Sequence, residues 1–258
     1  MALIDAAIYP RKVLCAGWLS AQSMPLLDEL GLSVKKFGGR PIDSATFYNA
    51  DLSKSVQPNF AQAPGVLLDR TRFDQHLVKT ATKAGATFLD GCFVTDVVLE
   101  EDAVSLVRAD GDPIRSRLLI VASGRGTPLL ARLKLGTGST LTGSWVAQVD
   151  ADASGEEGTA ALAVVLGIDA SGGFGLVIRT EGHVSVGLYT SSDKETVRPH
   201  LAALCRAVAV AKIIDTDLSG LAAKVGVVDS PGAAALAMDT HVAKHTLIVG
   251  GVRVSRQR

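Results

Sequence analysis

Two short runs of the chain, residues 118–122 (LLIVA) and 246–250 (TLIVG), are apolar on both faces of an extended backbone, apart from Thr246. A strand with this pattern has to be covered on both faces, as in a parallel sheet that carries helices on either side. A third apolar run, Ala2–Ile4, closes at Asp5 and also reads as a strand. The sequence therefore predicts an α/β layer built on a parallel sheet.

Helices are predicted where apolar residues recur with the 3.6-residue period, in residues 20–30 and 70–84. Each of these stretches is followed directly by a glycine, the residue at which helices commonly end. Residues 192–195 form a capping-box pattern, which predicts a third helix running to about residue 212.

Antiparallel strands are predicted in two other regions, residues 32–64 and 140–189, where apolar and polar residues alternate between turn residues. We expect these regions to form a sheet separate from the parallel one. Residues 93–99, 103–108 and 114–122 read as three successive strands joined by an acidic turn and a glycine-containing turn.

Composition restricts the classes of partner. Lys plus Arg and Asp plus Glu number 26 each, so no net field draws the chain toward nucleic acid or an anionic membrane. Three widely spaced cysteines match neither a disulfide framework nor a zinc site, which favours a reducing, cytoplasmic location. The longest apolar run, residues 160–168, is far shorter than the ~20 residues of a membrane helix. We expect small-molecule partners, no nucleic acid and no transmembrane segment.

Two motifs point to other chemistries, and each is incomplete. Gly124-Arg-Gly126 follows a strand like the glycine-rich turn of a dinucleotide-binding fold, but Leu129 stands at the third glycine position. Ser123 follows the same strand without either glycine of the GxSxG turn that holds a hydrolase nucleophile. The histidines show no zinc-binding spacing, so no metal site is predicted.

Taken in order, several segments resemble the flavoprotein superfamily of para-hydroxybenzoate hydroxylase and the geranylgeranyl reductases, and more specifically its reductase-like branch. The strand ending at Asp5 resembles the second strand of that family, which ends in a ribose-binding acid. Residues 9–12 (YPRK) followed by 15–17 (CAG) resemble the loop that runs along the flavin. Arg70 with Phe73-Asp74 resembles the family's helix start, in which an arginine precedes Phe-Asp.

The resemblance continues into the middle of the chain. Residues 91–94 resemble the strand whose backbone meets the adenine, and residues 120–124 are similar to an Ala-Asp-Gly segment with Ser123 at the place of the acid. Residues 172–179 and 184–187 resemble a strand pair of the reductases' substrate domain. There the Trp-x-Phe-Pro-Lys run of the reductases is replaced by LVIR at 176–179 in this sequence.

The resemblance implies FAD as the cofactor, NAD(P)H as an electron donor, and an apolar organic substrate that is reduced, hydroxylated or halogenated. The residues that it assigns to the cofactor are Asp5, Arg11, Cys15, Gly17, Arg70, Val94, Ser123, Gly124 and Gly250. The residues that it assigns to the substrate are Phe174 and Arg179. No catalytic acid or base is nominated, because the chemistry would be that of the cofactor.

The implied fold class is α/β with mixed α+β character. A partial FAD-binding, Rossmann-like parallel sheet with a β-meander would comprise residues 1–34, 66–138 and 241–258. An antiparallel-sheet substrate domain, interleaved with it, would comprise residues 35–65 and 139–240.

Two phosphate-binding segments of the family are absent from this sequence. The opening strand, GxGxxG turn and helix would precede Met1, and the Gly-Asp pair of the last strand is replaced by Gly250-Gly251. Because backbone N–H groups at such helix starts hold the pyrophosphate, we expect weak or no FAD binding by this chain alone.

Without the opening strand, residues 2–5 and 247–250 would lack a shared neighbour, and we expect homodimerisation through the exposed sheet edges. The leading interpretation is a truncated FAD-dependent oxidoreductase. The alternative is a non-enzymatic remnant or small-ligand-binding module that keeps the same scaffold.

Overall fold

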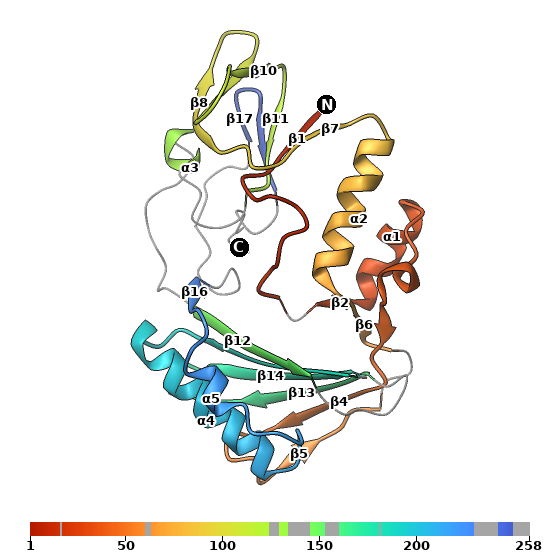
Figure 1. Ribbon diagram of the computed structural model, residues 1–258, viewed down its shortest axis with the longest axis vertical. Helices are drawn as coiled ribbons and strands as arrows, with labels where there is room; N and C mark the ends of the chain where they lie inside the picture. Colours follow the sequence, from red (N-terminus) through yellow and green to blue (C-terminus); the bar gives the residue numbers. More distant parts are fainter. Residues whose placement is uncertain are drawn as a thin grey trace. The chain divides into compact units, whose positions relative to one another are not determined.

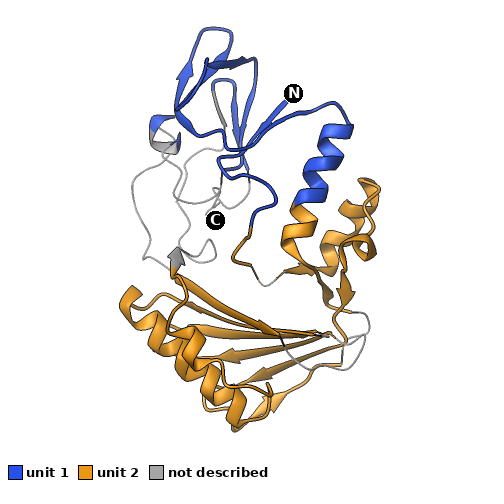
Figure 2. Ribbon diagram, viewed as in Figure 1, with its two compact units in different colours: residues 1–11, 75–144, 229–258 blue, residues 12–74, 145–228 orange. Residues whose placement is uncertain are grey.

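The computed structural model describes residues 1–15, 17–59, 63–123, 129–133, 145–152, 160–180, 182–229 and 242–249. The chain forms two compact units, each assembled from segments far apart in the sequence (Figure 2). Unit 1 comprises residues 1–11, 75–144 and 229–258, and unit 2 comprises residues 12–74 and 145–228.

Unit 2 is built on a seven-stranded mixed sheet with the order β16-β12-β15-β14-β13-β4-β5 (Figure 1). Its strands are β4 (Ser44–Tyr48), β5 (Ser55–Val56), β12 (Trp145–Asp152), β13 (Ala160–Leu166), β14 (Phe174–Thr180), β15 (His183–Thr190) and β16 (Val228–Asp229). The strands β12 to β15 pair antiparallel, which confirms the antiparallel pairing predicted for residues 140–189. The strand β4, from the other region predicted to be antiparallel, instead pairs parallel with β13, so the prediction is wrong for this pairing.

Side chains of this sheet alternate between two apolar faces. On one face, Val177 and Val186 pack with the helices α4 (Val197–Val210) and α5 (Ser219–Ala222), as in Figure 1. On the other face, Leu176 belongs to a separate buried cluster with Ile42 and Leu67. Both faces are covered, which is why the central strands carry apolar residues at nearly every position. The helix predicted in residues 192–212 is confirmed as α4, but it begins at Val197, after the short 3-10 turn η3 (Lys194–Thr196). The predicted capping box at 192–195 does not open it, because neither Asp193 before η3 nor Thr196 before α4 makes a side-chain capping hydrogen bond.

A smaller sheet of unit 2 positions the candidate site. It has the antiparallel order β2-β6-β3. Its strands and the short helices beside them are β2 (Trp18–Ser20), β3 (Arg40–Pro41), β6 (Gly65–Leu67), η1 (Ala21–Ser23), α1 (Met24–Glu29) and η2 (Val34–Phe37). The helix predicted in residues 20–30 is confirmed, with Pro25 tolerated in its first turn.

The helix α2 (Arg70–Lys83) confirms the second predicted helix and begins in unit 2. Its first turn is anchored by Phe73, whose ring meets that of Phe37 edge-on at 5.5 Å between centroids. Residues 12–34 and 66–74, which we expected with the cofactor domain, therefore lie in unit 2. The pairing of β2 and β3 with β6 holds them there.

The described residues of unit 1 form three small sheets. A parallel pair joins β1 (Ala2–Ile4) to β7 (Thr87–Leu89), and a meander joins β8 (Val94–Leu99), β9 (Val104–Arg108) and β10 (Ile114–Ser116). In the third sheet, β11 (Leu119–Val121) pairs parallel with β18 (Thr246–Ile248), which also pairs with β17 (Val242–Ala243). The short helix α3 (Leu129–Arg132) contributes Leu129 to the core of this unit.

The prediction of one strand over residues 114–122 is wrong. The segment is divided into β10 and β11, which pair with different sheets, and Ser116 Oγ donates a hydrogen bond to the Leu118 carbonyl at the break. Within the described residues, β11 is also an edge strand rather than a central one, because β18 is its single partner. Its two faces differ accordingly, since Val121 is 2% exposed and Ile120 is 54% exposed.

The two terminal strands belong to one core although they lie in different sheets. Ile4 of β1 packs against a buried cluster that includes Val121 of β11 and Ile248 of β18. That a missing strand once lay between them stays a prediction. Dimerisation through their edges stays a prediction.

None of the helices in the described ranges combines the length and the apolar character that crossing a bilayer requires.

The turn between β13 and β14 is organised by the carboxylate of Asp169. Its Oδ1 accepts hydrogen bonds from Ser171 N (2.9 Å), Ser171 Oγ (2.6 Å) and Gly173 N (3.0 Å), and its Oδ2 accepts one from Thr190 Oγ1. Burial raises the pKa of Asp169, but the hydrogen bonds from Ser171, Thr190 and Gly173 outweigh it and lower the pKa from 3.8 to about 2. The ionised carboxylate therefore stabilises the folded state.

We expect Asp169→Asn to lower the free energy of unfolding at pH 7 by about 1 kcal/mol, a value discounted for the exposure of the site. The folded-state pKa lies below the unfolded one, so this stability is present above pH 3.8 and is lost as the pH falls toward about 2. Urea unfolding of both proteins between pH 7 and pH 2 measures the difference. Asp215→Asn, at an exposed position, is the control, and a pH-independent difference for Asp169→Asn would contradict the assignment.

Candidate functional site

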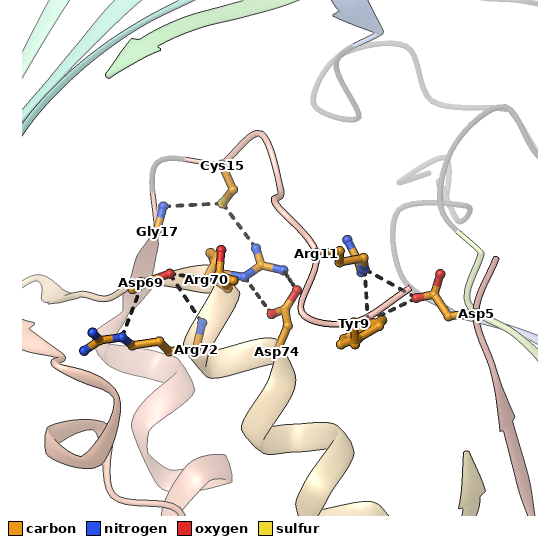
Figure 3. A network of polar contacts seen from close by, with 10 residues as sticks. Asp5, Tyr9, Arg11, Cys15, Gly17, Asp69, Arg70, Arg72 and Asp74 are labelled. Atoms are coloured by element: carbon orange, nitrogen blue, oxygen red, sulfur yellow. Dashed lines mark hydrogen bonds and ion pairs between the residues drawn. The ribbon is translucent and has the colours of Figure 1, made fainter. Parts of the chain in front are cut away.

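In unit 2, the thiol of Cys15 lies beside an arginine that is fixed by a carboxylate. Arg70 Nη1 donates to Cys15 Sγ at 3.2 Å, while Arg70 Nε and Nη2 donate to the two carboxylate oxygens of Asp74 at 2.9 and 3.1 Å (Figure 3). The backbone N–H of Gly17 also donates to Cys15 Sγ, at 3.4 Å. Two donors, one of them cationic, thus converge on one sulfur atom.

The charge of Arg70 is secured by its neighbours. Burial lowers the pKa of Arg70, but the hydrogen bond to Asp74 and the charge of Cys15 raise it above its ordinary value. The side chain of Asp74 is only 10% exposed, so the bidentate pair is substantially removed from solvent. A fixed positive charge therefore lies beside Cys15 Sγ.

Gly17 is required by a close approach of two backbone segments. Leu68 N donates to the Gly17 carbonyl at 3.0 Å, and a Cβ on residue 17 would lie 2.2 Å from the Leu68 carbonyl oxygen. The φ angle of Gly17 is +76°, a region that side chains rarely adopt. These constraints hold the loop of Cys15 against the start of α2.

Tyr189 joins this region and has no counterpart among the residues predicted from sequence. Its ring stacks on that of Phe174, with centroids 4.8 Å apart and planes inclined by 6°. Burial raises the pKa of Tyr189, and an electrostatic interaction with Cys15 raises it further. The structure thus groups Phe174, a predicted substrate residue, with Tyr189 on one face of the large sheet.

Arg179 does not belong to that group. Phe174 and Arg179 are separated by five residues in the same strand, so their side chains lie on opposite faces of the sheet. One substrate molecule lying against this face cannot be lined by both side chains. The sequence already contains this information, because residues an odd number of positions apart in a strand point to opposite faces of the sheet.

A second polar cluster lies in unit 1, at the end of β1. Tyr9 OH donates to Asp5 Oδ2 at 3.0 Å, and Arg11 Nε donates to Tyr9 OH at 3.0 Å and lies 3.4 Å from Asp5 Oδ2 (Figure 3). Ala7 N donates to Asp5 Oδ1 at 2.9 Å. Burial raises the pKa of Tyr9, and the raising effects of burial and Asp5 outweigh the lowering effect of Arg11.

The backbone of Asp5 ties this cluster to the segment before β8. Asp5 N donates to the Leu89 carbonyl and Cys92 N donates to the Asp5 carbonyl, both at 3.0 Å. The predicted ribose acid and the predicted adenine segment are therefore adjacent. Val94 opens β8 opposite Arg108, and its side chain packs against the core of unit 1.

The carboxylate of Asp5 can accept one further hydrogen bond. An ionised carboxylate offers about four lone-pair sites, and the donors described here use one on Oδ1 and two on Oδ2. The side chain is 30% exposed, so the remaining site on Oδ1 can be reached by a ribose hydroxyl. One acceptor position of Asp5 is therefore left for a hydroxyl donor.

The other predicted residues give no phosphate site in the described part of the chain. Ser123 is exposed after β11, while Gly124 and Gly250 lie outside the described residues. Across the described ranges, no group of three His, Cys, Asp or Glu side chains is arranged to hold a metal ion.

No family model matches the chain. An uncharacterised protein of Methanosarcina barkeri is 31% identical over 122 residues, which cover 47% of this chain and 30% of that protein. A geranylgeranyl bacteriochlorophyll reductase-like protein of Thermoplasma acidophilum aligns over 97% of this chain and 64% of its own length, with a TM-score of 0.75 and 16% identity.

Two halogenases are also similar in structure. The alignment with the flavin-dependent halogenase CmlS covers 96% of this chain and 48% of CmlS, with a TM-score of 0.70 and 21% identity. The alignment with the myxobacterial FAD-dependent halogenase CndH covers 97% of this chain and 62% of CndH, with a TM-score of 0.71 and 19% identity. The chain thus spans about half to two thirds of these structures, and 30% of the curated relative. These similarities establish the fold, and the predicted fold class is confirmed.

Proposed function

We propose that this chain, which has the fold of the FAD-dependent oxidoreductases, binds the adenosine half of FAD through unit 1 and serves a redox reaction on an apolar organic substrate. Because the two phosphate-binding segments of the family are missing from this sequence, we expect that binding by this chain alone is weak. The observation that carries the proposal is the position of Asp5, which directly follows β1 and is hydrogen-bonded through its backbone to Leu89 and Cys92. Asp5 would accept a hydrogen bond from a ribose hydroxyl. The backbone of residues 91–94 would meet the adenine.

In unit 2, we propose that Cys15, Gly17 and Arg70 contact the cofactor and that Phe174 contacts the substrate. Support comes from the two N–H donors on Cys15 Sγ, which keep the thiol oriented, and from the stacked pair of Phe174 and Tyr189, which offers an apolar surface. FAD, when bound, would supply the electron-transfer chemistry, and NAD(P)H is the proposed electron donor. Reduction, hydroxylation and halogenation of the substrate all remain within this proposal.

A binding experiment with two flavins tests the role of unit 1. FAD and FMN are titrated separately into the full chain while flavin fluorescence is followed. FMN lacks the adenosine half, so we expect Asp5→Asn to weaken FAD binding by about tenfold and to leave FMN binding unchanged. Asp110→Asn, at an exposed position in the turn after β9, is the matched control.

The outcomes separate the two candidate functions. Equal loss of FAD binding in both variants, or none in Asp5→Asn, would overturn the assignment of Asp5. A folded chain that binds neither flavin at any accessible concentration would favour the non-enzymatic binding module.

A further inference from the structure

A hollow of about 170 Å³ lies on the face of the seven-stranded sheet that also packs against α4. One wall is formed by β4, where Ser44, Thr46 and Tyr48 alternate with the buried Ala45. Because side chains two apart share a face, the three hydroxyl-bearing residues point to the same side. Within the described residues, none of their hydroxyl groups has a hydrogen-bond partner, and all three residues are partly exposed in the hollow.

The hollow exists because the strand between its walls carries small side chains. Ala161 of β13 pairs with Ser44 on one side and Arg179 on the other. Ala163 lies in the same way between Thr46 and Val177. The methyl groups of these two alanines therefore form the floor of the hollow. The hydroxyl-bearing residues of β4 lie on one side of this floor, and Val177 and Arg179 of β14 lie on the other.

The opposite rim is cationic. Arg179 Nη1 donates to the Ile213 carbonyl at 3.0 Å, which holds the guanidinium against the turn after α4. Lys212, in the same turn with φ +56°, also lines the hollow. No Asp or Glu lines the hollow, and neither cation forms an ion pair within the described ranges. Two positive charges therefore face a polar wall without a compensating carboxylate.

We propose that this hollow binds a small organic anion, with a carboxylate or phosphate group on Arg179 and Lys212 and a second polar group on the hydroxyls of β4. A guanidinium donates to such oxyanions through several N–H groups, and the alanine floor accommodates a short aliphatic body. The volume is below the ~300–1,000 Å³ of sites for drug-sized ligands, so the ligand is small. The site lies on the face opposite Phe174 and does not depend on flavin binding.

The test is a titration of the full, isotope-labelled chain with sodium lactate, sodium acetate and inorganic phosphate at constant ionic strength and pH, followed by amide chemical shifts. We expect saturable shifts in β4 and in residues 211–213 for at least one anion, and comparison of lactate with phosphate identifies the preferred head group. Arg179→Gln and Lys212→Gln should each weaken binding about tenfold or more. Arg206→Gln, which removes an exposed arginine of α4 outside the hollow, should leave it unchanged.

A variant that fills the hollow distinguishes a specific binding site from non-specific attraction of anions to positive charge. Ala163→Leu occupies the floor without changing any charge, and we expect it to abolish the saturable shifts while the remaining amide spectrum is retained. Linear, unsaturated shifts with every anion would overturn the proposal. So would equal weakening by Arg179→Gln and Arg206→Gln, or unchanged binding in Ala163→Leu when that variant is folded.

Discussion

Replacing Gly17 by alanine is expected to lower the free energy of unfolding by about 3 kcal/mol. The new Cβ would lie 2.2 Å from the Leu68 carbonyl oxygen, a distance at which the backbone has to move. That carbonyl belongs to the segment leading into α2, and Gly17 itself receives a hydrogen bond from Leu68 N. Relief of the clash would therefore also displace the thiol of Cys15 from Arg70.

Gly38→Ala is the matched control for this variant. Gly38 has a φ angle of +70°, close to the +76° of Gly17, but nothing lies within 4 Å of its added Cβ. It should cost only the ~1 kcal/mol of a left-handed residue with a side chain. Urea denaturation of both variants isolates the cost of the clash, and equal destabilisation would show that residue 17 tolerates a side chain.

Replacing Arg70 by glutamine is expected to destabilise the chain by about 2–3 kcal/mol, because it leaves the carboxylate of Asp74 buried without its bidentate partner. Asp74 is 8% exposed, and the Arg70 guanidinium contacts both of its oxygens. Much of this loss should be recovered in the double variant Arg70→Gln, Asp74→Asn, in which the carboxylate is removed together with the guanidinium. Denaturant unfolding of the two single variants and the double variant gives the coupling free energy.

The same helix turn supplies the control pair. Arg72 and Asp69 form an ion pair at 3.6 Å, with side chains 74% and 51% exposed. Arg72→Gln should therefore change the free energy of unfolding by less than about 0.5 kcal/mol. If Arg70→Gln changed the free energy of unfolding as little as Arg72→Gln does, the buried pair of Arg70 and Asp74 would not stabilise the start of α2.

Much of the secondary structure could be predicted from the periodic spacing of apolar residues along the sequence. The helices α1, α2 and α4 and the strands β1, β8 and β9 were predictable, because their apolar residues recur with the spacing of one backbone conformation. The pair of Arg70 and Asp74 was visible for the same reason, since residues four apart on a helix are neighbours. The division of residues 114–122 was not predictable, because it is imposed by two partner strands from elsewhere in the chain.

The sequence by itself determined the main helices and several of the strands, and it identified Asp5, Cys15 and Arg70 as polar residues at their ends or between them. Only the tertiary structure decided which of these meet: Cys15 reaches Arg70, and Tyr189 stacks on Phe174, through strand pairing. The hollow at Arg179 depends on the register of Ser44 with Ala161, more than 100 positions later in the sequence. Periodicity follows from the sterics of neighbouring residues, whereas register follows from the burial of side chains contributed by distant segments.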